Sequence, residues 1–86
     1  MNNDIIKIEL EDELDLHHFD PKDAKAVLLE FIEIAASKGK KEIRIVHGKG
    51  RSTLKTIVQK ELERNSKIKG YLNDGSNWGA TIAFLK

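Results

Sequence analysis

Two amphipathic helix-like segments, each lying between strand-like segments, are the feature that most constrains the fold of this chain. The first begins at Asp20-Pro21, where a capping carboxylate precedes the proline favoured in a first helical turn, and continues to about Lys38. The second begins at Ser52 or Thr53 and continues to Asn65. Apolar runs typical of strands occupy residues 6–10, 14–16, 43–46, 68–72 and 80–85. The predicted order is therefore βαβαββ, with the run at 6–10 as an additional piece.

This order predicts an α/β two-layer sandwich, in which two helices pack on a mixed four-stranded sheet. Strands joined through a helix pair in parallel with right-handed crossovers, whereas the last two strands, joined by a turn at 73–77, pair antiparallel. The 86 residues suffice for one domain, which we expect at residues 13–86 after an N-terminal extension at residues 1–12. The alternating run at 6–10 either adds one extra N-terminal strand or continues into residues 14–16 as one long, kinked strand.

A glycine-punctuated turn at residues 46–52, with the sequence VHGKGRS, connects the strand at 43–46 to the second helix. The first N–H groups of a helix have no partner within the helix, and the helix dipole favours negative charge there. His47, Lys49 and Arg51 add side-chain donors to the same turn. The residues predicted to bind a phosphate are Gly48, Lys49, Gly50, Arg51 and Ser52. The alternative is that the glycines only form the turn, since their spacing matches neither common phosphate-binding fingerprint.

The net charge of +1 conceals two oppositely charged halves. Residues 1–36 contain 10 acidic and 3 basic side chains, whereas residues 37–86 contain 4 acidic and 12 basic ones. The glycine turn lies in the basic half, which favours a polyanion such as DNA or RNA as its partner. The acidic half, with its very apolar helix, favours a protein partner instead. If the two halves interleave in the fold, the charges mix on the surface and neither preference follows.

Asp15, His17 and His47 are the candidate catalytic residues, because they fall at the ends of two strands expected to be parallel neighbours. Ligands of α/β sheets bind outside the carboxyl ends of the strands. The two-residue period of a strand places Asp15 and His17 on the face opposite Leu14 and Leu16. Histidine titrates near neutral pH and can donate or accept a proton, and a carboxylate can orient it, act as a base or bind a cation. The alternative interpretations are that Asp15 is only a solvated carboxylate and that His17 only marks the entry to the helix.

Three motifs at these positions resemble the small MutS-related (Smr) domain family. They are Leu14-Asp15-Leu16-His17, His47-Gly48-Lys49-Gly50 and Gly79-Ala80-Thr81, and the resemblance covers nearly the whole chain. Two positions depart from the family pattern. His18 stands where the family usually has a glycine after the first motif, and Ser52 stands where a third glycine often follows the second.

The resemblance implies a fold similar to the C-terminal domain of bacterial translation initiation factor three. It also implies nucleic-acid binding and, in many members, nicking or endonuclease activity on DNA or RNA, in DNA repair, recombination or RNA processing. Asp15 is the single clear carboxylate of the site, and Asp20 is the candidate for a second, although we expect Asp20 to cap the helix. Mg²⁺ and Mn²⁺ prefer several oxygen ligands, so either ion is an option but no residue is assigned as its ligand. On RNA the 2′-hydroxyl is an internal nucleophile, and acid–base groups can suffice. The alternatives are a non-catalytic nucleic-acid-binding module and a protein-interaction module of repair or ribosome machinery.

The composition excludes several other classes of protein. The chain has no cysteine, so disulfides and thiolate metal sites are excluded. No apolar run approaches the roughly 20 residues that span a bilayer, and no signal peptide is visible at the N-terminus. We therefore expect a cytoplasmic protein or domain with no membrane partner.

Overall fold

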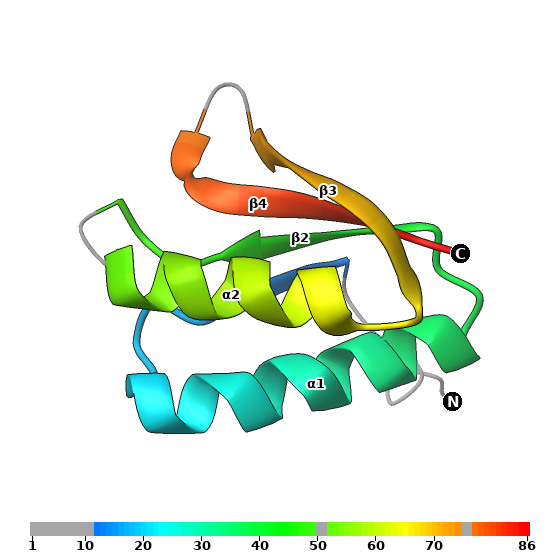
Figure 1. Ribbon diagram of the computed structural model, residues 1–86, viewed down its shortest axis with the longest axis horizontal. Coiled ribbons are helices and arrows are strands. Elements are labelled where there is room, and N and C mark those ends of the chain that lie inside the picture. The colour runs from blue at the N-terminus through cyan, green and yellow to red at the C-terminus, as the bar shows by residue number, and fades with distance from the viewer. Residues whose placement is uncertain (1–11, 50–51, 75–76) are drawn as a thin grey trace, which may run out of the picture.

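The computed structural model describes residues 12–49, 52–74 and 77–86, within which it has two helices and four strands (Figure 1). In chain order the elements are β1 (Glu13–Asp15), α1 (Pro21–Ser37), β2 (Glu42–Val46), α2 (Ser52–Arg64), β3 (Ile68–Asp74) and β4 (Asn77–Leu85). The predicted order of elements is confirmed. Residues 1–11 lie outside the described residues, and with them the extra strand predicted at 6–10 and nearly all of the predicted N-terminal extension.

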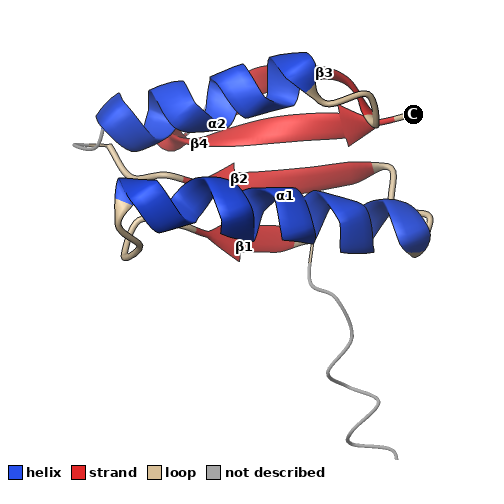
Figure 2. Cartoon of the chain, turned by 60° about the horizontal axis from the view of Figure 1, so that its bottom comes forward, coloured by secondary structure: helices blue, strands red, loops and turns tan. Residues whose placement is uncertain are grey.

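The four strands form one mixed sheet in the order β1-β2-β4-β3. β1 and β2 are parallel, as predicted, with Leu14 opposite Ile45, and β4 is antiparallel to both of its neighbours. The pairing expected between β2 and β3, which a helix also joins, is wrong, because β4 lies between them. Helices α1 and α2 lie on the same face of this sheet (Figures 1 and 2). Both crossover connections step along the sheet in the same direction, so a common right-handedness places both helices on that face. The expected two-layer sandwich is therefore confirmed.

Helix α1 begins and ends within one residue of its predicted bounds. The carbonyl oxygen of Asp20 accepts the N–H groups of Asp23 and Ala24 at 2.9 and 3.0 Å. Its carboxylate makes no capping hydrogen bond, which corrects the expectation that this side chain caps the helix. Gly39 follows the helix with φ +75°, a conformation that favours glycine and ends the helix. Within the described residues, neither helix is long and apolar enough to cross a membrane.

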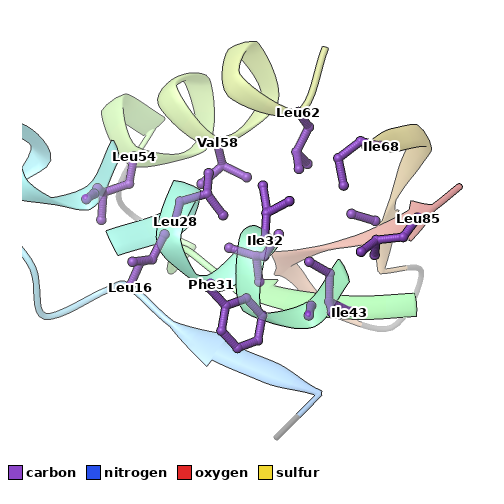
Figure 3. Close-up of a cluster of buried hydrophobic side chains, with 14 residues drawn as sticks. Leu16, Leu28, Phe31, Ile32, Ile43, Leu54, Val58, Leu62, Ile68 and Leu85 are labelled. Carbon is purple, nitrogen blue, oxygen red and sulfur yellow. The ribbon is translucent and has the colours of Figure 1, made fainter. Parts of the chain in front are cut away.

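The core fills the space between the sheet and the two helices (Figure 3). Apolar side chains from both helices and from β2, β3 and β4 meet there, and none is more than 8% exposed. The residues labelled in Figure 3 are Leu16, Leu28, Phe31, Ile32, Ile43, Leu54, Val58, Leu62, Ile68 and Leu85. Burial of each large apolar side chain contributes about 1.5–3 kcal/mol. This cluster therefore anchors the strands that carry the candidate site at their ends.

The β3–β4 hairpin extends further toward its turn than predicted. Residues 73–77 were expected to form a turn, but Asn73 pairs with Thr81, and Asp74 pairs with Asn77 after a register shift. Arg44 of β2 donates from Nε to Oδ2 of Asp74 over 2.9 Å, and this ion pair links the end of β3 to the middle of the sheet. Cross-strand pairing and the ion pair thus outweigh the turn preference of these polar residues.

Candidate nucleic-acid interface

The candidate site lies at the edge where β1 and β2 end side by side (Figure 2). The N–H of Leu16 donates to the carbonyl oxygen of Val46 over 2.7 Å, so the chain leaves both strands at the same level. Asp15 and His17 flank this bond on one strand, and His47 follows it on the other. The connection to α1 and the glycine turn to α2 therefore begin next to each other.

Asp15 and His17 form a hydrogen-bonded pair on the accessible side of this edge. Oδ1 of Asp15 accepts the backbone N–H of His17 at 3.0 Å and also contacts Nδ1 of its ring. Burial alone would raise the pKa of Asp15, but the side-chain and backbone hydrogen bonds from His17 outweigh it and lower that pKa. The side chains of His17 and Asp15 are 39% and 49% exposed, so both can touch a ligand. An imidazole oriented through Nδ1 by an ionised carboxylate can accept a proton at Nε2.

His18 adds a second imidazole beside this pair. Its ring centroid lies 3.8 Å from that of His17, with 40° between the ring planes, and the residue is exposed. His18 was not predicted as a site residue. The available signal was its departure from the usual glycine at this position.

The glycine turn after β2 is held by the first part of β4. The carbonyl oxygen of Gly79 accepts the N–H groups of His47 and Gly48 at 2.8 and 2.9 Å, and Gly48 has φ +89°. A Cβ on Gly79 would lie 3.0 Å from the backbone nitrogen of Lys49 and 3.2 Å from the carbonyl carbon of Gly48. Only glycine allows the two segments to approach this closely. Gly79 is thus a structural part of the site, although only its place in the third motif pointed to it.

His47 differs from the other two candidate catalytic residues because it is fully buried. Its Nε2 lies 2.9 Å from Oγ1 of Thr81, and its Nδ1 lies 3.5 Å from the carbonyl oxygen of Gly48. A carbonyl only accepts, so Nδ1 carries the proton and Nε2 accepts the Thr81 hydroxyl in the neutral ring. Burial lowers the pKa of His47; the Gly48 contact opposes this, and the charge of Lys55 adds to it. In this position the ring connects the start of the glycine turn to Thr81 of β4 and is closed to solvent.

The predicted phosphate-binding residues are described only in part. Gly48 and Lys49 are in the described turn, and Lys49 is exposed. Gly50 and Arg51 lie outside the described residues, as does the side chain of Ser52, whose backbone begins α2. The turn does open a helix, as the phosphate argument requires, and phosphate binding stays a prediction.

The described residues of this edge do not fit a divalent-cation site. Across residues 12–49, 52–74 and 77–86, no group of three or more His, Asp or Glu side chains is placed to hold a metal ion. Mg²⁺ and Mn²⁺ prefer several oxygen ligands, and Asp15 supplies one carboxylate.

Comparison with known proteins relates nearly the whole chain to one domain. The family model for the Smr domain matches residues 14–86. "Endonuclease MutS2" of Aquifex aeolicus is 35% identical over 83 residues, and "Endonuclease MutS2" of Lactococcus lactis is 37% identical over 78 residues. These alignments cover 92% and 86% of this chain but only 11% and 10% of those proteins. The chain therefore spans about a tenth of the length of the curated relatives that it matches.

Two solved structures share the fold. The Smr domain of Thermus thermophilus MutS2 superposes with a TM-score of 0.82 at 23% identity, covering 86% of this chain and 96% of that one. YdaL, a stand-alone small MutS-related protein from Escherichia coli, superposes with a TM-score of 0.83 at 21% identity, covering 87% of this chain and 64% of that one. At these identities the two structures support the fold alone.

Proposed function

Because the chain belongs to the Smr domain family, we propose that it binds nucleic acid and cleaves the phosphodiester backbone at the edge where β1 and β2 end. The observation that carries this proposal is the exposed Asp15–His17 pair beside a glycine turn that opens a helix. The pair supplies a base. The turn supplies a binding place for the phosphate, next to which the base must accept its proton. The endonuclease names of the relatives support the same activity.

In the proposed reaction, His17 accepts the proton of the attacking oxygen as that oxygen bonds to phosphorus. The attacking oxygen is the 2′-hydroxyl on RNA and a water molecule on DNA. The ionised Asp15 stabilises the imidazolium that forms. The bond from phosphorus to the leaving oxygen breaks, and this oxygen takes a proton from a second residue, which acts as the general acid. We assign that role to His18, whose exposed ring contacts His17.

Positive charge stabilises the phosphate as it gains negative charge in the reaction. Lys49 and the first N–H groups of α2 supply it at the turn. We propose that His47 acts as a positioning residue, because its buried ring bonds to Thr81 and supports the turn. This assignment replaces the direct contact with substrate that the sequence suggested. The described residues do not offer a set of ligands for Mg²⁺ or Mn²⁺, so the proposed reaction uses the acid–base groups of this edge.

Cleavage of supercoiled plasmid and of a structured RNA tests the proposal. Wild type is compared with Asp15→Asn, each in Mn²⁺ and in EDTA to determine whether a metal is needed. Glu42→Gln is the matched control, because Glu42 is an exposed carboxylate at the opposite end of β2. General acid–base catalysis contributes about 10²–10⁴-fold, so Asp15→Asn should slow cleavage roughly 100-fold or more while it keeps its affinity. The control should cleave like wild type.

Three other outcomes have distinct meanings. Equal cleavage by wild type and Asp15→Asn would overturn the catalytic proposal and indicate a contaminating nuclease. Salt-dependent binding without strand breaks would support the non-catalytic binding module. Absence of any affinity for nucleic acid would leave the protein-interaction module, with the acidic N-terminal half as its surface.

A further inference from the structure

Four lysines line one pocket at the end of the domain opposite the candidate site. Lys40, Lys41, Lys67 and Lys86 line a cavity of about 340 Å³, and the side chains of its other lining residues carry no charge. They come from three segments that meet near the C label of Figure 1: the α1–β2 connection, the α2–β3 connection and the end of β4. We call this site the lysine pocket.

Backbone hydrogen bonds hold the three segments of the lysine pocket together. The N–H of Leu85 donates to the carbonyl oxygen of Lys41 over 2.9 Å, and the N–H of Lys86 donates to that of Lys67 over 3.0 Å. The lysine Cα atoms are therefore fixed by the fold. Residues far apart in the sequence converge here because β4 ends between the two connections.

The charges of the lysine pocket are only partly balanced. Nζ of Lys40 lies 3.1 Å from Asp12, and Nζ of Lys67 lies 3.8 Å from Glu33. Lys41 and Lys86 are exposed, and neither has an ion-pair partner among the residues that the structure describes. Helix dipoles do not account for these two lysines, because neither lies in the last turn of a helix. Like charges gathered in one place repel each other, and a bound anion relieves that repulsion.

A larger hollow beside the lysine pocket provides a contrast. It has about 630 Å³, and three acidic and three basic side chains line it, so that its formal charges cancel. Those side chains are Asp12, Glu13, Glu42, Lys40, Lys41 and Arg44. This hollow shares Lys40 and Lys41 with the lysine pocket, so the two together have five basic and three acidic side chains. The excess of two positive charges comes from Lys67 and Lys86, which line the lysine pocket alone.

We propose that the lysine pocket is a second contact site for the phosphodiester backbone of a nucleic acid, separate from the edge proposed for cleavage. A lysine ammonium is a compact charge that binds phosphate oxygens without reading bases, so this contact adds affinity and orientation but no sequence preference. The inference rests on the nucleic-acid-binding part of the proposed function and not on its catalytic part.

The length of β2 sets the size of the nucleic acid that can touch both sites. The strand runs from the lysine pocket toward the glycine turn, and 8 positions separate Lys41 from Lys49. At about 3.3 Å per residue for extended chain, the Cα atoms of the two lysines are at most about 26 Å apart, because the turn after β2 can only shorten the separation. A duplex rises about 3.4 Å per base pair, so one duplex of about eight base pairs or more spans both sites.

The test measures affinity for a duplex of about 16 base pairs against salt concentration, for wild type and for Lys41→Gln/Lys86→Gln. Each phosphate contact contributes about 0.9 to the slope of log K against log salt. In the double variant the magnitude of this negative slope should therefore decrease by up to about 2. Its affinity for the duplex should be about tenfold weaker or more at 0.1 M salt. Its melting temperature should equal or exceed that of wild type, because two of the mutually repelling charges are removed. Its kcat at saturating substrate should match that of wild type. The control is Lys60→Gln, which is compared with the single variant Lys41→Gln so that each removes one positive charge. Lys60 is an exposed lysine on α2.

Two results would overturn the inference alone: an unchanged slope in the double variant, or an equal loss of affinity in Lys60→Gln, which would indicate a general charge effect. A wild-type domain with no affinity for the duplex would overturn both the inference and the proposed nucleic-acid binding. If Asp15→Asn cleaves as fast as wild type while the double variant has a reduced salt slope, the lysine pocket is supported and only the catalytic proposal is overturned.

Discussion

Replacing Gly79 with alanine tests whether the close approach of β4 builds the glycine turn. The new Cβ would lie 3.0 Å from the backbone nitrogen of Lys49, 3.1 Å from its Cγ and 3.2 Å from the carbonyl carbon of Gly48. Two of these three atoms belong to the backbone of the turn, so they cannot swing away as the end of a flexible side chain does. The turn must move by a few tenths of an ångström, which strains the two hydrogen bonds that Gly79 accepts.

We expect Gly79→Ala to lower the free energy of unfolding by about 1–3 kcal/mol, the usual cost of overpacking a close contact. For a domain of this size, a loss of about 2 kcal/mol lowers the Tm by roughly 8–16 °C. Thermal and urea unfolding measure the stability. Duplex affinity measures the site and should fall as well, because the displaced turn includes Gly48 and Lys49.

Gly70→Ala is the matched control, since Gly70 lies in β3 and a Cβ there would meet no atom within 4 Å. This variant should keep the Tm and the affinity of wild type. A Gly79→Ala variant with wild-type Tm and affinity would refute the reasoning, because the turn would then accommodate the methyl group. An equal loss of stability in both variants would refute it too, since the cause would be alanine in a strand and not the contact with the turn.

Two further predictions concern the buried ring of His47. Thr81→Val keeps the side-chain shape but removes the hydroxyl 2.9 Å from Nε2 of His47, which leaves a buried nitrogen unpaired. The free energy of unfolding, measured by chemical denaturation, should therefore fall by about 1–3 kcal/mol. An unchanged value would show that this bond contributes nothing to stability. Burial lowers the pKa of His47 in the folded state. As the pH falls through about 6.5, the ordinary pKa of histidine, the unfolded state therefore binds more protons than the folded state does. The free energy of unfolding should therefore decrease from about pH 7.5 downward until the folded-state pKa is passed, and more steeply for wild type than for His47→Gln. Parallel curves would contradict a neutral buried ring.

Local periodicity explains why most of the fold could be predicted. A two-residue or 3.6-residue period reports both the local conformation and the buried face, and it identified both helices and the four described strands. The parallel pairing of β1 with β2 followed from the helix between them. The place of β4 between β2 and β3 was not predicted. Periodicity shows which face of a strand is buried, but it does not show which strands far apart in the chain become neighbours.

The candidate site shows the same division between local and distant information. His47 shares the parity of Ile43 and Ile45, which are buried, so the two-residue period already indicated an inward ring. Its place beside the glycines instead suggested an exposed catalytic group. The contact with Thr81, 34 positions away, and the close approach of Gly79 have no local signal, because both depend on the pairing of β2 with β4. The Asp15–His17 pair could be anticipated because its two residues are neighbours in the chain.

The strand that comes last among the elements occupies the interior of the sheet, and this has a consequence for how the domain is made. While a ribosome is still adding residues, β1, α1 and β2 can associate, but β3 has no strand beside it until β4 arrives. The same strand brings the carbonyl oxygen that holds the glycine turn and the hydroxyl that meets His47. Since these contacts join distant parts of the chain and cost loop-closure entropy, we expect them to form late in folding. The growing polypeptide thus carries an unassembled site through synthesis, and the site is completed only once β4 has been translated and inserted.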